Sequence, residues 1–181
     1  MTDTVVPDSR GGRDREVAPP SAFRPSSSVL EEGLEIRTEV LANGITVSTQ
    51  PVPGARSVST GVWVRQGSVH ETPEISGASH MLEHMVFKGT PTRSSRDLAL
   101  EIESLGGSLD AFTTREYTAY QARVLDRHMG TALDILSDLT LRPLLRDEDL
   151  DLEREVILEE IATVEDTPDD WVFDLHDERF W

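Results

Sequence analysis

The sequence predicts an α+β fold, in which a largely antiparallel sheet carries helices packed on one face. Two observations lead to this prediction. Segments of alternating apolar and polar residues, which are typical of strands, dominate residues 35–71 and return near residue 108. Segments with apolar residues at helical spacing are interleaved with the later strands and fill the last third of the chain. This order is the one expected of an α+β sheet domain.

Four strand regions follow from the pattern. The segment EIRTEVLANGITVSTQPV predicts a hairpin, because Asn43-Gly44 is a turn pair that tolerates positive φ. The segment SVSTGVWVRQGSVHE predicts a third strand. Two further strands are expected at about 108–113 and 117–124, separated by TTRE.

The helices are bounded by recognisable end signals. One helix is expected from about Gly77-Ala78-Ser79 to Lys88-Gly89, and SSRDLALEIESLGG predicts a second with a serine cap and a Gly-Gly stop. The remaining helices are expected at about 126–140, 147–165 and 169–180. No internal repeat is visible.

Composition excludes several classes of protein. The formal net charge of −17 and the absence of a basic patch argue against a nucleic-acid partner. No apolar run approaches the length of a membrane span, so a membrane partner is not expected. The absence of Cys fits a reducing compartment, and nearly all basic residues are Arg, which suggests a GC-rich bacterial genome. We therefore expect a cytoplasmic bacterial protein.

The first 33 residues differ from the rest of the chain. They lack periodicity and are rich in Pro, Gly, Ser and charge, which predicts a disordered tail. They contain no apolar core of a secretory signal. The folded domain is therefore expected at residues 34–181.

The chemistry of the chain centres on His80-Met81-Leu82-Glu83-His84. On a helix, two histidines four residues apart project from one face and can bind the same zinc ion. Glu83 then lies beside a metal-bound water without being a ligand. H-x-x-E-H is the inverted form of the zinc-protease signature.

A catalytic zinc site usually needs a third protein ligand. His70, His128 and His176 have no companion ligand at helical spacing, and we interpret them as ordinary surface or turn histidines. The acidic segment 147–165 is the better source. Its apolar residues at helical period form one stripe, which comprises Leu152, Val156, Ile157, Ile161 and Val164.

Two carboxylates fall inside this stripe, and a buried carboxylate needs compensation. Glu160 is expected to lie deepest, so we predict it as the zinc ligand and Glu153 as an auxiliary or second-sphere acid. An ion pair with Arg is the rival interpretation of Glu160. For Glu153 the rival is a partly solvated acid at the edge of the stripe.

From residue 34 onward the chain resembles the insulinase/pitrilysin family of zinc metalloproteases, which includes the mitochondrial processing peptidases and their bacterial relatives. The resemblance rests on five segments: LANGITV, GVWVRQGSVHE, GASHMLEHMVFKGT, LGGSLDAFTTREYTAY and EREVILEEIATVEDTP.

The resemblance implies a set of roles. His80, His84 and the distal Glu160 would bind Zn²⁺, Glu83 would be the general base, and Glu153 matches an earlier glutamate of the same family segment. The strand of Ala111, Phe112 and Thr113 would lie at a sheet edge and pair with extended substrate by main-chain hydrogen bonds. A plain sheet strand is the alternative for these three residues.

The resemblance predicts a zinc-dependent metalloendopeptidase that hydrolyses peptide bonds of extended peptides or unfolded protein segments. Residues 34–181 would form its N-terminal catalytic domain, truncated before the end of that domain. Family members are longer and enclose the site with a second homologous half, so a second half or a partner subunit is expected. The alternative is a non-catalytic or truncated family member that acts as a binding or assembly subunit.

Overall fold

The computed structural model describes residues 35–180, so the expected tail at 1–33 lies outside the described residues. The chain divides into two compact units, with the boundary between Val52 and Pro53.

The first unit contains the predicted hairpin. Strands β1 (Arg37–Val40) and β2 (Thr46–Thr49) pair antiparallel, with Val40 opposite Thr46. The turn uses Gly44 at φ +88°, and the Asn43 side chain accepts a hydrogen bond from the Ile45 amide at 3.1 Å. Asn43 and Gly44 therefore have the roles that the sequence predicted.

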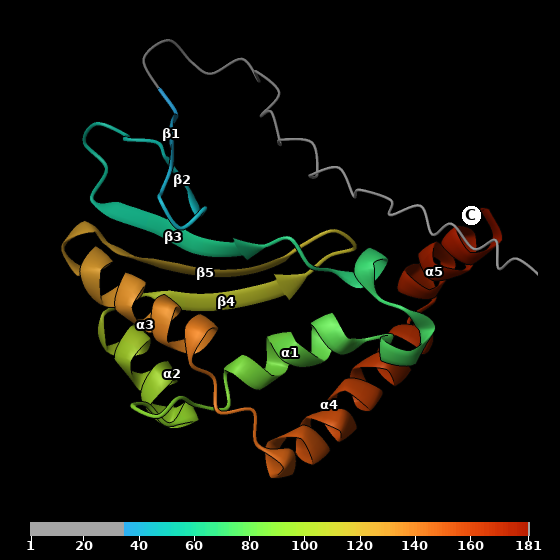
Figure 1. Ribbon diagram of the computed structural model, residues 1–181. Helices are drawn as coiled ribbons and strands as arrows, with labels where there is room; N and C mark the ends of the chain where they lie inside the picture. Colours follow the sequence, from blue (N-terminus) through green and yellow to red (C-terminus); the bar gives the residue numbers. More distant parts are fainter. Residues whose placement is uncertain (1–34, 181) are drawn as a thin grey trace, which may run out of the picture. The chain divides into compact units, whose positions relative to one another are not determined.

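The second unit contains a three-stranded antiparallel sheet in the order β3-β5-β4 (Figure 1). Its strands are β3 (Ser57–Val64), β4 (Ser108–Thr113) and β5 (Thr118–Leu125). The two later strands agree with the predicted bounds to within one residue. Strand β4 is an edge strand of this sheet.

Five α-helices follow or interrupt these strands: α1 (Ala78–Val86), α2 (Ser95–Ser104), α3 (Met129–Leu141), α4 (Asp147–Glu165) and α5 (Pro168–Phe180). Short 3-10 turns cover Ser68–His70, Pro73–Ile75 and Asp126–His128. The last turn replaces the first residues of the helix that was expected from 126. The Ser94 side chain caps α2, as predicted, and exchanges hydrogen bonds with Asp97.

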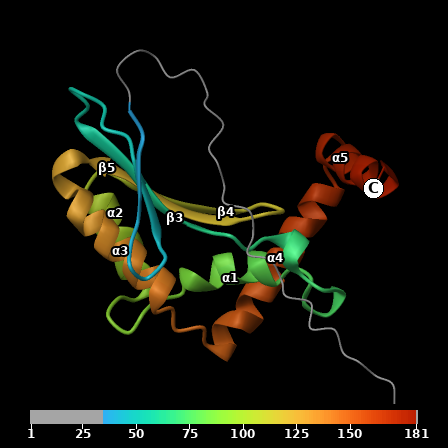
Figure 2. The ribbon, with the colours of Figure 1, turned by 45° about the horizontal axis from the view of Figure 1, so that its top comes forward.

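The core lies between one face of the sheet and helices α1, α2 and α3 (Figures 1 and 2). On β5, alternate residues face these helices, and on β4 the residues opposite them lie on the same face. The buried cluster comprises Val86, Leu98, Ile102, Tyr120, Ala122, Val124, Ala132, Ile135, Leu136 and Leu139. An antiparallel sheet with helices on one face confirms the predicted fold class.

Helix α4 packs against α1 on one side and α5 at its end (Figure 2). It therefore lies beside the helix that carries the two histidines. Within residues 35–180, no helix is both long and apolar enough to cross a membrane.

Candidate metal centre

Helix α1 presents the histidine motif, and its start is held by a carboxylate. Glu71 accepts hydrogen bonds from the Gly77 and Ser79 amides, both at 2.7 Å. These bonds, those from Ser79 foremost, hold the pKa of Glu71 below its usual range. Gly77 precedes the helix with φ +88°, a conformation that favours glycine. Glu71 thus satisfies backbone donors that the start of a helix leaves without partners.

Three potential ligand atoms converge between α1 and α4. The Nε2 atoms of His80 and His84 lie 3.2 Å apart, and each lies 3.6 Å from Oε2 of Glu160. Within the described part of the chain, these residues form the one group of three or more His, Cys, Asp or Glu whose geometry could hold a metal ion. Zn–N and Zn–O bonds of ~2.0–2.2 Å in a tetrahedron separate ligand atoms by roughly 3.3–3.5 Å. The donor types and their spacing therefore fit zinc.

Glu83 lies on the same helix between the two histidines. Its Oε2 is buried and has no hydrogen-bond partner among the described residues. Burial raises the pKa of Tyr120 to about 12, and the negative charge of Glu83 adds to this shift. A buried carboxylate oxygen without a hydrogen-bond donor is energetically costly. This oxygen is therefore free to accept a proton from a bound water or substrate.

Glu153 contacts the same site from the opposite side of the His84 ring. Its Oε2 lies 3.0 Å from Nδ1 of His84, and its Oε1 forms an ion pair with Lys88. Burial alone would raise the pKa of Glu153, but hydrogen bonds from Lys88 and His84 outweigh it and lower that pKa. A carboxylate on Nδ1 fixes the imidazole tautomer and presents Nε2 to a metal. This placement suits a second-sphere role.

The structure corrects the predicted burial of the two glutamates. The side chain of Glu160 is 49% exposed and that of Glu153 only 8% exposed, so Glu153 is the deeper acid and not an edge residue. The physical reason is that the His84 ring and the Lys88 side chain both contact the Glu153 carboxylate and shield it from solvent. The oxygen of Glu160 nevertheless faces the two imidazoles, as expected of a ligand.

The prediction that the apolar stripe of α4 faces the core is also largely wrong. Leu152, Val156 and Ile161 are 66%, 41% and 49% exposed, and Val164 is 36% exposed. Helical phase identifies residues that share a face, but it does not say which neighbour covers that face. Here α1 covers the side of Glu153.

Strand β4 lies beside α1, as expected of Ala111, Phe112 and Thr113. The Thr113 hydroxyl donates to the Ser79 carbonyl at 3.5 Å, and Ala111 packs against the core. Phe112 is on the other face, where its ring contacts Tyr117 at a centroid distance of 6.0 Å. The edge position is confirmed, and pairing with a substrate stays a prediction.

The other three histidines make local contacts. Nδ1 of His70 accepts from the Gly67 amide at 3.2 Å, and Nε2 of His128 accepts from Arg127 at 3.0 Å. The ring of His176 lies 5.0 Å from that of Phe180. None of the three belongs to the metal-binding group found within the described residues.

Two residues of the site were not predicted from the sequence. Lys88 could have been found, because it follows His84 by four residues, the spacing that brings side chains together on a helix. Glu71 could not have been found in this way, because the loop that returns its carboxylate to the start of α1 has no periodicity.

Comparison with known proteins identifies a family. The family described as Insulinase (Peptidase family M16) matches residues 46–181. An uncharacterized zinc protease of Bacillus subtilis, YmxG, is 47% identical over 140 residues, which are 77% of this chain and 34% of that protein. A probable mitochondrial-processing peptidase subunit beta of Arabidopsis thaliana is 40% identical over 90% of this chain and 31% of its own length.

A solved structure agrees with the fold. The crystal structure of a protease from Helicobacter pylori superposes on this chain with a TM-score of 0.73 at 23% sequence identity. The superposition covers 77% of this chain and 34% of the Helicobacter pylori chain. This chain thus spans about a third of the length of the relatives it matches.

Proposed function

Because the chain belongs to the insulinase family, peptidase family M16, we propose that it carries the catalytic centre of a zinc-dependent metalloendopeptidase. The observation that carries the proposal is the convergence of two imidazole Nε2 atoms and the Glu160 carboxylate within 3.6 Å of one another. A buried carboxylate oxygen without a partner, on Glu83, accompanies them on the same helix. A relative that is 47% identical to this chain is described as a zinc protease, which supports zinc-dependent proteolysis.

Each residue has a defined task in the proposed reaction. His80, His84 and Glu160 would hold the ion, and Glu153 keeps the His84 ring oriented through Nδ1. When bound, zinc would supply Lewis acidity to the scissile carbonyl and lower the pKa of a water. Glu83 accepts the proton of the attacking water and passes it to the leaving amine. The overall reaction is hydrolysis of a peptide bond.

The proposed substrate is an extended peptide or an unfolded protein segment. Among the described residues, strand β4 pairs with β5 alone, so its other edge can pair with a further strand. Main-chain pairing of this kind holds a peptide largely irrespective of its side chains. Strand β4 also contacts α1, so a peptide on this edge would lie near the histidine motif.

The proposed working enzyme includes a second homologous half or a partner subunit. The basis is that the matched residues cover only 34% and 31% of the length of two relatives. Large apolar side chains are also exposed on α4 and α5, among them Leu158 at 54% and Phe173 at 71%. Exposed apolar residues in such numbers favour a protein interface.

Zinc content after dialysis tests the metal site. We expect about one zinc per chain in the unaltered protein and none in Glu160→Ala, with Glu159→Ala as the matched control on the same helix. Absence of zinc from the unaltered chain would refute the proposed centre.

Peptide cleavage then separates the enzyme from a non-catalytic binding subunit. Glu83→Gln should keep its zinc and lose most chelator-sensitive cleavage, measured with an unfolded protein substrate. Zinc binding with no cleavage, in this chain and in its complex with a second half, would favour the binding subunit instead.

A further inference from the structure

Two carboxylates of α4 reach the same imidazole from opposite sides. Glu153 and Glu160 are seven residues apart, about two helical turns, so they share a face of the helix. Glu153 lies 3.0 Å from Nδ1 of His84, and Glu160 lies 3.6 Å from Nε2. A further contact is therefore needed to keep the Glu153 carboxylate on the Nδ1 side of the His84 ring.

Lys88 provides this contact with the Glu153 carboxylate. Its ammonium group forms an ion pair with Oε1 of Glu153, while Oε2 of the same carboxylate faces His84. Each carboxylate oxygen therefore has its own partner, which fixes the rotation of the group. Because Glu153 is only 6% exposed, water does little to replace a lost partner.

The backbone of Lys88 is itself held in place. Its amide donates to the Met85 carbonyl at 3.1 Å, and its carbonyl accepts from Nη2 of Arg146 at 2.8 Å. Arg146 directly precedes α4, so this bond joins the end of α1 to the start of the helix that carries Glu153. The backbone from which the Lys88 side chain extends is thus anchored to both helices.

We propose that Lys88 is a positioning residue of the metal centre. Its charge holds the Glu153 carboxylate against Nδ1 of His84, and this contact aims the Nε2 lone pair at the ion. The inference rests on the proposed zinc site and deepens it. Partners beyond the ligands of a metal typically change its affinity by about 10–100-fold, and Lys88 acts through one further residue.

The contact can be observed directly in the metal-free chain. Lys88 is the only lysine of the 181 residues, so biosynthetic labelling with ¹³C,¹⁵N-lysine gives a single side-chain NMR signal. We expect Glu153→Gln to move this signal towards that of a solvated lysine, and Glu159→Gln, a matched change on the same helix, to leave it in place. A signal that Glu153→Gln does not move would overturn the contact.

Zinc affinity then tests the role. In competition with a chromophoric chelator, Lys88→Met should bind zinc about tenfold more weakly than the unaltered chain, and Lys88→Arg should restore most of the affinity. Arg96→Met removes the same charge from the exposed surface of α2 and should change nothing.

The decisive comparison places Lys88→Met in a chain that already carries Glu153→Gln. If Lys88 acts through Glu153, the second change should cost less than about twofold there. An equal loss in both backgrounds, or no loss in either, would overturn the role of Lys88. An unaltered chain that binds no zinc would instead refute the proposed function, so the two failures are distinguishable.

Discussion

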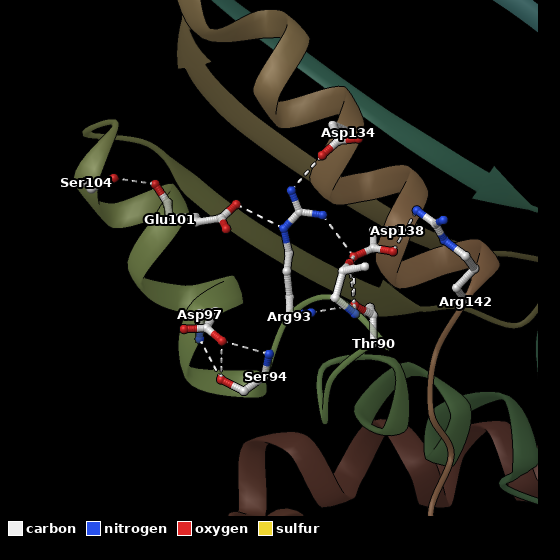
Figure 3. A network of polar contacts seen from close by, with 10 residues as sticks. Thr90, Arg93, Ser94, Asp97, Glu101, Ser104, Asp134, Asp138 and Arg142 are labelled. Atoms are coloured by element: carbon white, nitrogen blue, oxygen red, sulfur yellow. Dashed lines mark hydrogen bonds and ion pairs between the residues drawn. The ribbon is translucent and has the colours of Figure 1, made fainter.

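The second unit contains two polar clusters whose carboxylates are paired differently: the closed cluster around Asp138 and the open cluster around His80, His84 and Glu160. Asp138 on α3 is fully buried, and its Oδ2 accepts from Thr90 and Thr92 at 2.7 Å and from Arg93 at 2.9 Å (Figure 3). Arg142 pairs with its other oxygen at 2.9 Å. Around His80 and His84, by contrast, potential ligand atoms face one another.

Arg93 extends the closed cluster to two helices. Its guanidinium contacts Glu101 on α2 at 3.0 Å and Asp134 on α3 at 2.6 Å (Figure 3). Donors and acceptors thus alternate through this cluster, and it ties the α1–α2 loop to the core helices. In the cluster of histidines, Nε2 of His80, Nε2 of His84 and Oε2 of Glu160 converge in an arrangement that could hold a metal ion. The difference teaches that the donors and acceptors around Asp138 satisfy one another, which favours stability, whereas the arrangement around the histidines suits the proposed metal binding.

The largest effect should come from breaking the closed cluster. Asp138→Ala leaves the Arg93 charge, whose side chain is only 15% exposed, without its buried partner. We expect a loss of about 3–5 kcal/mol in the free energy of unfolding, measured by urea denaturation. The control Asp134→Ala removes an exposed partner of the same Arg93 and should cost below about 1 kcal/mol. Equal losses would contradict the comparison.

Acid should weaken the same cluster. Burial alone would raise the pKa of Asp138, but hydrogen bonds from Thr92, Thr90 and Arg93 outweigh it and hold that pKa well below its usual range. A lowered pKa in the folded state stabilises the fold above the unfolded-state pKa of about 3.9, and this stabilisation is lost as the pH falls below that value. The urea midpoint should therefore fall more steeply between about pH 5 and 2 in the unaltered chain than in Asp138→Asn. Parallel curves would argue against this role of the charge.

The cap of α1 should have a smaller effect. Glu71→Ala removes the acceptor of two amides at the start of this helix, and we expect a loss of about 1–2 kcal/mol in the free energy of unfolding. Glu74→Ala, an exposed acid of the same loop, is the control and should cost little. Circular dichroism during urea denaturation measures both variants, and a cost as small for Glu71→Ala as for the control would remove the capping role.

The smallest effect on stability should come from the open cluster. Glu160 is 49% exposed and faces two imidazoles, so Glu160→Ala should change the free energy of unfolding of the metal-free chain by less than about 0.5 kcal/mol. The same variant should lose zinc. A large loss in the free energy of unfolding of metal-free Glu160→Ala, comparable to that of Asp138→Ala, would contradict the comparison between the two clusters.

Local signals in the sequence predicted most of the elements. Asn43-Gly44 predicted its turn, and the helical spacing of His80 and His84 predicted which side chains meet, because both depend on nearby residues. The relative burial of Glu153 and Glu160 could not be predicted, because it depends on which side chains far away in the sequence, such as His84 and Lys88, cover each carboxylate. The pairing of Arg93 with Asp138 joins residues 45 positions apart, and no periodicity indicates it.

Gly67 has a consequence for motion near the site. A Cβ at this position would lie 2.3 Å from the Thr114 carbonyl oxygen, so the loop before α1 runs directly against the tip of the β4–β5 hairpin. The Val69 amide donates to the Arg115 carbonyl of that tip at 2.9 Å. We therefore expect the loop and the tip to open together as one local unit. Hydrogen exchange at the Val69 amide would measure how often the end of β4 is released.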